Sequence, residues 1–327
     1  MRVVVAGWQG YLGSALTRML LEAGHTVVGM DAGHYMSVPS GAAWHGSKNF
    51  FPLPMDVRLV EQWYRNLQHC DAVYHLVDIN GASAARRVAE TGSGRAMLFD
   101  VNATTVSQML RAVFDHEVPR VFVVGDMMGK FDDGVYGAVC TARREAYEYG
   151  ISGRQITDAV FRYVELPELF GPYRSCRFRM DRGINMMVGQ AVKERMITLA
   201  DPHRIGVHLF VEDAARYLKS LLSEKDVGSK VVRPFGSDTV RSDRAVAEMI
   251  VELLPGVEIH QPTTPEDGES FEIGVPDPGI SCTNLTDGIR ETIKAAKEIP
   301  SEIEWTDPFF HNDKQIGIFT KRERVDE

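Results

Sequence analysis

The feature of this sequence that most constrains its fold is a glycine-rich turn close to the N-terminus. The segment Gly7-Trp8-Gln9-Gly10-Tyr11-Leu12-Gly13 follows the apolar run Val3–Ala6 and precedes an amphipathic stretch. Glycines at this spacing allow a tight strand-to-helix turn, a close approach of the backbone to a pyrophosphate, and close packing of the helix. The segment therefore predicts a dinucleotide-binding βα unit, although a glycine triplet alone is also compatible with an ordinary strand-to-helix turn.

The first half of the chain alternates short β-branched runs with helical patterns, which is typical of βαβ units and a parallel sheet. We expect strands at 2–6, 26–30, 73–76, 120–124 and 159–164, and helices at 12–23, 101–114, 184–193 and 243–254. The predicted fold class is α/β, a Rossmann-type doubly wound parallel sheet with a smaller C-terminal lobe that binds substrate. We assign residues 1–165, rejoined by about 205–225, to the Rossmann domain, and 166–204 and 226–327 to the smaller lobe.

Acidic residues follow two of the apolar segments at positions that suit NAD. Asp31 ends the second strand, where a carboxylate accepts both ribose hydroxyls of NAD and repels the extra phosphate of NADP. The alternative is that Asp31 only caps the following turn. Asp56 and Val57 follow the next apolar segment and are interpreted as an adenine contact, or else as part of a solvated loop.

Composition narrows the class of ligand. The chain has 327 residues and a formal net charge of -9, so it offers no basic footprint for nucleic acid or an anionic membrane. The four cysteines (Cys70, Cys140, Cys176 and Cys282) have no metal-ligand spacing, and no run reaches the roughly 18 apolar residues of a membrane span. We expect a small-molecule ligand, no metal, no disulfide and a cytoplasmic location.

The sequence resembles the extended short-chain dehydrogenase/reductase family, which includes the NAD-dependent nucleotide-sugar epimerases and dehydratases. The resemblance rests on the order and spacing of the glycine loop, Asp31, Asp56-Val57, His75-Leu76, Asn102, Tyr136-Gly137, Arg162-Tyr163, Phe170-Gly171-Pro172, and the segments 210–213 and 285–291. It implies bound NAD, a nucleotide-linked sugar or a similar polar substrate, and a homodimer. The cofactor residues it implies are Gly7, Gln9, Gly10, Tyr11, Leu12, Gly13, Asp31, Asp56, Val57, Leu76, Asn102 and Tyr136.

The catalytic pair of that family is only half present. In the family a tyrosine transfers a hydroxyl proton while NAD exchanges a hydride, and a lysine four residues later lowers the tyrosine pKa. Tyr136 matches the tyrosine, but Cys140 occupies the lysine position. A tyrosine with an ordinary pKa is only about 0.1% ionised at pH 7, so loss of the cation removes on the order of a thousandfold in reactive base. Arg143, Arg144 and Lys130 are the candidates to replace it.

Other expected catalytic positions also depart from the family pattern. Our best alignment puts Asp126 where the family has a serine or threonine, and a one-residue gap would put Met127 there instead. Asp126 is interpreted as a general acid or base, or as the cap of the following turn. Met127 and Met128 stand where dehydratases carry an Asp-Glu pair, which disfavours a standard 4,6-dehydratase. Cys140 is either a nucleophile or a small residue on a helix face. Glu165 is either a functional residue of the same cleft or a solvated strand-end carboxylate.

Basic residues after Pro172 point to the substrate. Arg174, Arg177, Arg179 and Arg182 crowd a segment that in the family lines the nucleotide diphosphate pocket, and the alternative is a solvated basic loop. Asn185 matches a family position near the sugar nucleotide, and Arg204 is the candidate to replace an arginine missing from 205–208. Three hypotheses follow: a redox epimerase or related isomerase or lyase, an NAD-binding pseudoenzyme, and a non-redox enzyme that uses Asp126 or Glu165.

Overall fold

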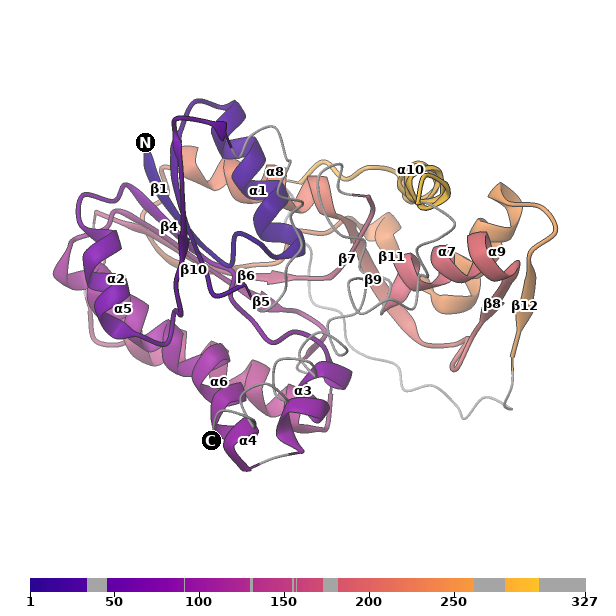
Figure 1. The fold of residues 1–327 in the computed structure, drawn as a ribbon, viewed down its shortest axis with the longest axis horizontal. Helices are drawn as coiled ribbons and strands as arrows, with labels where there is room; N and C mark the ends of the chain where they lie inside the picture. The colour runs from indigo at the N-terminus through magenta and orange to yellow at the C-terminus, as the bar shows by residue number, and fades with distance from the viewer. Residues whose placement is uncertain are drawn as a thin grey trace.

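A parallel β-sheet forms the centre of the larger part of the molecule (Figure 1). The computed structural model describes residues 1–33, 46–90, 92–129, 132–154, 156, 158–172, 182–261 and 280–299. Within these ranges seven parallel strands pair in the order β10-β6-β5-β4-β1-β2-β3. They are β1 (Arg2–Ala6), β2 (Thr26–Asp31), β3 (Phe50–Pro54), β4 (Ala72–His75), β5 (Arg120–Asp126), β6 (Val160–Leu166) and β10 (Gly228–Val232). The predicted Rossmann-type α/β fold is confirmed.

Helices cover both faces of this sheet, which explains why its central strands are apolar on both sides. In β1 the side chains of Val3 and Val5 pack toward α1 (Tyr11–Glu22) and α8 (Val211–Ser220). Val4 and Ala6 point the other way, toward α2 (Val60–Leu67), α5 (Thr105–Asp115) and α6 (Val135–Ile151). The four residues from Val3 to Ala6 are fully buried, as expected for a strand covered on both faces of a parallel sheet.

The helix predicted at 101–114 is part of a longer helical segment. After α3 (Ala82–Ala89), the chain forms α4 (Gly92–Phe99), a π-helical turn η2 (Asp100–Thr104) and then α5 without interruption. Near the start of α6, Tyr136 and Val139 pack in one apolar cluster with Val88 of α3 and Leu98 of α4. The helices α3 and α4, which follow β4 in the chain, therefore pack against the start of α6, where Tyr136 lies.

The smaller lobe lies beside the carboxyl ends of the main sheet strands and is drawn to the right in Figure 1. It contains a three-stranded sheet of β7 (Glu168–Phe170), β9 (Ile205–Phe210) and β11 (Val240–Ser242), and a pair formed by β8 (Met196–Thr198) and β12 (Glu258–His260). Three helices, α7 (Gly183–Glu194), α9 (Asp243–Leu253) and α10 (Leu285–Lys297), share its apolar core. The short turns η4 (Leu221–Ser223) and η5 (Ser237–Thr239) complete the described elements.

The chain crosses between the two lobes more than once. In the predicted return segment, α8 packs against α1, whereas β9 pairs with β7 and β11 rather than with the main sheet. Our assignment of residues 226–327 to the smaller lobe differs from the structure at β10, which pairs with β6 in the main sheet. Because β10 is an edge strand with exposed and half-buried residues, its sequence lacks the apolar run that marks the central strands.

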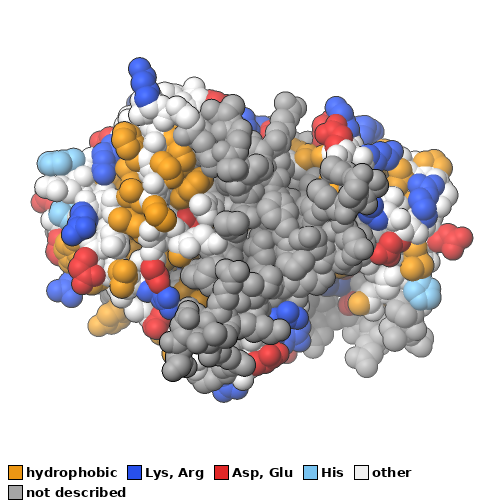
Figure 2. All heavy atoms as spheres, viewed as in Figure 1, with side chains coloured by type: hydrophobic (Ala, Val, Ile, Leu, Met, Phe, Trp, Pro, Cys, Tyr) orange, Lys and Arg blue, Asp and Glu red, His pale blue; other side chains and the backbone are white. Residues whose placement is uncertain are grey.

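The surface of the described residues carries both signs of charge. On the face drawn in Figure 2, Lys and Arg side chains are interspersed with Asp and Glu over both lobes. None of the described helices is long and apolar enough to cross a membrane. The described residues contain no group of three or more His, Cys, Asp or Glu side chains that could hold a metal ion.

Candidate dinucleotide and catalytic site

The glycine loop has the geometry that a dinucleotide phosphate requires. Gly7 has a φ of +88°, a backbone conformation that side-chain-bearing residues rarely adopt. A Cβ atom on Gly13 would lie 2.0 Å from the carbonyl oxygen of Gly7, so only glycine lets α1 begin this close to the turn. The N-cap residue of α1 is Gly10, which provides no side-chain cap. The start of α1 therefore has no side-chain cap from Gly10, as is common where a helix N-terminus binds an anion.

A cavity extends from this loop along the carboxyl ends of β1, β2 and β4. It is lined by Gly7, Gly10, Asp31, Ala32, Asp56, Val57, Leu76, Val77, Asp78, Ile79, Met97 and Val101. Six of these are predicted cofactor residues, namely Gly7, Gly10, Asp31, Asp56, Val57 and Leu76. In open parallel sheets, ligands bind at this edge of the strands.

Asp31 lies at the end of β2 with its carboxylate held by the loop. Its two oxygens accept hydrogen bonds from the amides of Gln9 (3.0 Å) and Gly33 (2.8 Å). Burial raises the pKa of Asp31 to about 6, although both hydrogen bonds lower it. Asp31 therefore caps the local turn and also lines the cavity, and its contact with the ribose stays a prediction.

The remaining predicted cofactor residues differ in how they relate to the cavity. Asp56 forms an ion pair with Arg58 at 2.6 Å while lining the cavity. The Asn102 side chain accepts a hydrogen bond from the amide of Ile79 (2.7 Å), so it positions the cavity wall rather than forming part of it. Leu12 packs against the apolar core.

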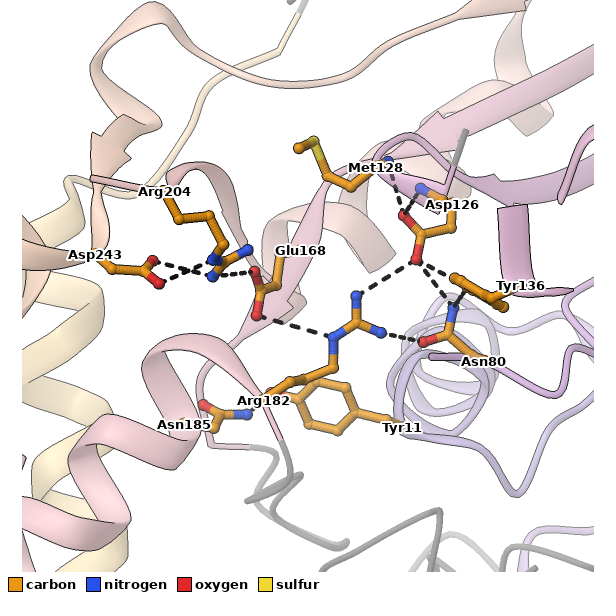
Figure 3. A network of polar contacts seen from close by, with 11 residues as sticks. Tyr11, Asn80, Asp126, Met128, Tyr136, Glu168, Arg182, Asn185, Arg204 and Asp243 are labelled. Atoms are coloured by element: carbon orange, nitrogen blue, oxygen red, sulfur yellow. Dashed lines mark hydrogen bonds and ion pairs between the residues drawn. The ribbon is translucent and has the colours of Figure 1, made fainter. Parts of the chain in front are cut away.

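Tyr136 lies near the start of α6, in contact with Asp126 and Asn80 (Figure 3). Its hydroxyl donates a hydrogen bond to Asp126 Oδ2 (2.9 Å) and accepts one from Asn80 Nδ2 (2.7 Å). The other oxygen of Asp126 accepts hydrogen bonds from the amides of Met128 (2.8 Å) and Gly129 (3.1 Å). Asp126, the last residue of β5, therefore caps the following turn and also binds the tyrosine.

The electrostatic environment of Tyr136 opposes its ionisation. Burial raises the pKa of Tyr136 well above its usual value, and the Asp126 and Asp78 carboxylates raise it further. Arg182 acts in the opposite direction. Burial likewise raises the pKa of the Cys140 thiol, whose sulfur packs closely against Gly129. Both groups hold their protons at neutral pH, and Cys140 has the surroundings of a small helix-face residue rather than of a nucleophile.

The basic residues that follow Tyr136 on α6 are engaged elsewhere. Arg143 is 2% exposed, and its guanidinium donates to the carbonyls of Val124 (2.8 Å), Val77 (2.8 Å) and Asn102 (2.9 Å). Arg144 forms ion pairs with Glu148 (2.5 Å) and Glu165 (2.6 Å). Lys130 lies outside the described residues. Neither arginine therefore stands in the place of the family's lysine.

Glu165 forms ion pairs with two arginines and has no contact with Tyr136 among the described interactions. Its carboxylate lies between Arg144 (2.6 Å) and Arg233 (2.5 Å), and the residue is 8% exposed. The structure thus places Glu165 in a separate charge cluster instead of in the Tyr136–Asp126 contact.

The predicted substrate residues fall into two groups. Asn185 donates to the Tyr11 hydroxyl (3.3 Å) and accepts from the amide of Gly171 (3.0 Å), so it joins α7 to α1. Arg204 forms an ion pair with Asp243 (2.8 Å) and a longer one with Glu168 (3.5 Å). Arg177 and Arg179, together with Arg174, lie outside the described residues.

Sequence reasoning missed Asn80 as a contact of Tyr136. A signal for it exists, because Asn80 lies in the polar segment that follows a buried strand, where parallel sheets place ligand-binding groups. Arg182 also contacts Asn80 and Asp126. Because Arg182 belongs to the smaller lobe, no local pattern in the sequence predicts this contact.

Residues 3–232 match the sequence model of the NAD dependent epimerase/dehydratase family. The chain belongs to this family. Family membership confirms the resemblance described above and makes NAD the cofactor on which such proteins depend. The positive φ of Gly7, the uncapped start of α1 and the Asp31 carboxylate fit the pyrophosphate and ribose of that cofactor.

Solved structures of nucleotide-sugar enzymes share the fold over almost the whole chain. TunA, described as an NAD-dependent NDP-hexosamine 5,6-dehydratase involved in tunicamycin biosynthesis, is 19% identical with a TM-score of 0.73, covering 92% of this chain and 99% of its own. UDP-glucuronic acid 4-epimerase from Bacillus cereus, in complex with UDP-glucuronic acid and NAD, is 17% identical with a TM-score of 0.74, covering 92% and 100%. A double mutant of DesIV, a dTDP-glucose 4,6-dehydratase from Streptomyces venezuelae with NAD and DAU bound, is 17% identical with a TM-score of 0.74, covering 94% and 100%.

Proposed function

We propose that this protein is an NAD-dependent enzyme that acts on a nucleotide-linked sugar, as an epimerase or a related isomerase or lyase. The observation that carries the proposal is the Tyr136 hydroxyl, 2.9 Å from the Asp126 carboxylate and 2.7 Å from the Asn80 amide. Asn80 directly follows Asp78 and Ile79, which line the cavity. The family match and the NAD and nucleotide sugars in related structures support this substrate class.

The chain offers contacts for the pyrophosphate and the adenosine half of the cofactor. The start of α1 would hold the pyrophosphate, beside a turn that is closed by hydrogen bonds from the Gly7 amide to the Met30 carbonyl (2.8 Å) and from the Gly10 amide to the Gly7 carbonyl (3.1 Å). Asp31 would accept the ribose hydroxyls. Asp56 and Val57 line the part of the cavity suited to the adenine. NAD held by these residues would supply a hydride acceptor for a sugar carbon and a donor for the reverse transfer.

Tyr136 and Asp126 together can move the proton that accompanies this chemistry. Tyr136 keeps its proton in the resting site, because its pKa is raised. A stable Tyr136 phenolate is therefore not the base that takes the proton of the sugar hydroxyl. As the sugar hydroxyl gives its proton to Tyr136 Oη, Tyr136 passes its own proton to Asp126 Oδ2 along the existing hydrogen bond. Tyr136 ends the transfer neutral and Asp126 ends it protonated, so negative charge is present on the tyrosine only in passing. The reverse transfer returns the proton to the sugar oxygen and restores the Asp126 carboxylate.

The protonated states of Tyr136 and Cys140 favour a second candidate function. The raised pKa of Tyr136 and the neutral Cys140 thiol fit a protein that binds NAD without redox turnover. Such a protein is either a sensor or scaffold, or an enzyme in which Asp126 alone transfers a proton. Its distinguishing property is that no NADH forms when the sugar binds.

The first experiment identifies the bound nucleotide and follows the cofactor during turnover. Acid-released nucleotide is identified by mass, and the protein is then mixed with a panel of nucleotide sugars while NADH absorbance is recorded. Transient NADH supports the redox proposal, and sugar binding without NADH supports the second candidate. A protein that binds neither NAD nor any nucleotide sugar contradicts both.

Variants of Tyr136 and Asp126 then test the proton transfer. We expect Tyr136→Phe and Asp126→Asn to slow NADH formation by about 10²-fold or more, since each removes a member of the relay. Tyr149→Phe is the matched control, because Tyr149 lies on the same helix but is 83% exposed. A Tyr136→Phe protein with an unchanged rate would show that the relay is wrong.

A further inference from the structure

The groups of its own lobe that face Tyr136 would compensate a negative charge on its hydroxyl oxygen poorly. The groups that face Tyr136 are Asp126 at the end of β5, Asp78 after β4, Cys140 on α6, and Arg182 at the start of α7. The two carboxylates and the thiol all oppose ionisation of the tyrosine. Of these four groups, the Arg182 guanidinium alone favours it.

Arg182 contacts both residues that bind the Tyr136 hydroxyl. Its guanidinium donates a short hydrogen bond to Asn80 Oδ1 and lies 3.4 Å from Asp126 Oδ2. Figure 3 shows it between these two side chains and Glu168. The Arg182 side chain is 27% exposed and the Asp126 side chain is 6% exposed, so solvent screens this pair only in part.

Glu168 anchors the other side of this guanidinium. One carboxylate oxygen lies 3.8 Å from Arg182 Nε, and the other lies 3.5 Å from Arg204. Although burial alone raises the pKa of Glu168, the Arg182 and Arg204 guanidiniums bring it below its ordinary value. A Cβ atom on Gly183 would lie 1.8 Å from Glu168 Oε1, so glycine beside Arg182 allows this approach. Arg182 therefore has a buried carboxylate partner on the side opposite Asn80 and Asp126.

We propose that Arg182 is a positioning residue that supplies, from the smaller lobe, the positive charge that relatives with a lysine at position 140 supply from the tyrosine's own helix. Arg182 holds Asn80 and Asp126 against the Tyr136 hydroxyl and lowers the cost of negative charge there. This inference rests on the proposed function, because it assigns Arg182 a part in the Tyr136–Asp126 proton transfer.

The decisive test measures the ionisation of Tyr136 directly and needs no substrate. Protein labelled with 3,5-difluorotyrosine, whose phenol is more acidic than that of tyrosine, is titrated by ¹⁹F NMR, and Tyr136→Phe assigns the signal. We expect Arg182→Gln to raise the Tyr136 pKa by about one pH unit and Arg182→Lys to leave it close to wild type. Arg144→Gln is the matched control, because its guanidinium pairs with Glu148 and Glu165, and it should leave the pKa unchanged. A Tyr136 pKa that is equal in wild type and Arg182→Gln overturns the proposal.

A rescue experiment provides the second arm. In the Arg182→Gln background, Cys140→Lys should lower the Tyr136 pKa again and restore part of the NADH formation, which Arg182→Gln slows by about tenfold at neutral pH. If the double variant folds and binds NAD but its Tyr136 pKa stays at the Arg182→Gln value, the proposal is contradicted. An effect of Arg182→Gln confined to the KM for nucleotide sugar assigns Arg182 to substrate binding and also overturns it. Absence of NADH in wild type contradicts the proposed function only, since the ¹⁹F titration does not depend on turnover.

Discussion

The raised pKa of Asp31 predicts that NAD affinity depends on pH in a range where most carboxylates are already ionised. In the free protein, burial raises this pKa to about 6. Ribose hydroxyls donate hydrogen bonds to the ionised carboxylate and favour that form in the complex. A proton and NAD therefore compete for Asp31, and the Kd for NAD should increase as the pH falls through 6.

The size of the effect follows from the fraction of ionised carboxylate. With a pKa of about 6, only about one molecule in ten carries an ionised Asp31 at pH 5, whereas nearly all do at pH 8. If the pKa of Asp31 returns to its ordinary value in the complex, the Kd should be about tenfold higher at pH 5 than at pH 8, or about 1.4 kcal/mol. Near pH 6, binding should release about half a proton.

Isothermal titration calorimetry of nucleotide-free protein with NAD, from pH 5 to pH 8, measures both quantities. Repeating the titration at pH 6 in buffers of different ionisation enthalpy gives the number of protons released. Asp31→Asn is the control, because it should bind NAD more weakly at pH 8 but with little dependence on pH. A wild-type Kd that is constant across this range, or an Asp31→Asn protein with the same slope as wild type, refutes the reasoning.

Two further predictions concern stability. Arg143→Ala should lower the free energy of unfolding by on the order of 3 to 5 kcal/mol, because it leaves several buried carbonyls without donors. Arg144→Ala should lower it by less than about 1 kcal/mol, because the Arg144 ion pairs are partly exposed. Urea denaturation of the two variants measures both losses, and equal losses would contradict the prediction. Burial lowers the pKa of His208 to about 4, so this histidine stays neutral in the folded protein while the unfolded chain takes up a proton below its ordinary value of 6.5. Stability from this group is present above pH 6.5 and is lost as the pH falls toward 4, so between pH 7 and 4.5 wild type should lose about 2.5 kcal/mol more than His208→Gln. Parallel losses in the two proteins would show that His208 does not titrate in this way.

The elements that could be predicted from the sequence are those whose burial is uniform. β1 is covered on both faces, so its residues read as an uninterrupted apolar run, and its predicted bounds are those observed. The glycine loop and Asp31 could be placed because a positive φ and a close backbone approach require particular residue types at fixed spacing. β10 lacks this signal, since an edge strand is only partly buried.

Asp126 is expected in the catalytic site from the family resemblance, but the basic residue beside Tyr136 could not be predicted in the same way, because its position depends on tertiary packing. Arg143 follows Tyr136 by seven residues, which places it on the same face of α6 but about 10 Å farther along the helix axis. Its guanidinium therefore meets the carbonyl groups at the ends of β4 and β5 instead of the tyrosine. Arg182 is distant in sequence and reaches the site only because α7 begins beside Asp126.

Because Arg182 comes from the smaller lobe and Tyr136 from the larger one, the proposed site depends on how the two lobes are held together. A lysine on α6 would keep its distance from Tyr136 wherever the smaller lobe lay, because both residues would belong to one helix. Arg182 keeps its distance only while α7 stays in place, and one restraint on α7 is the hydrogen bond from Asn185 to Tyr11 at the start of α1 (3.3 Å). Tyr11 belongs to the glycine loop that would bind the pyrophosphate, so the cofactor loop and the position of Arg182 share a physical connection. In this chain the charge that favours proton transfer at Tyr136 is therefore a property of the lobe arrangement as well as of the residues themselves.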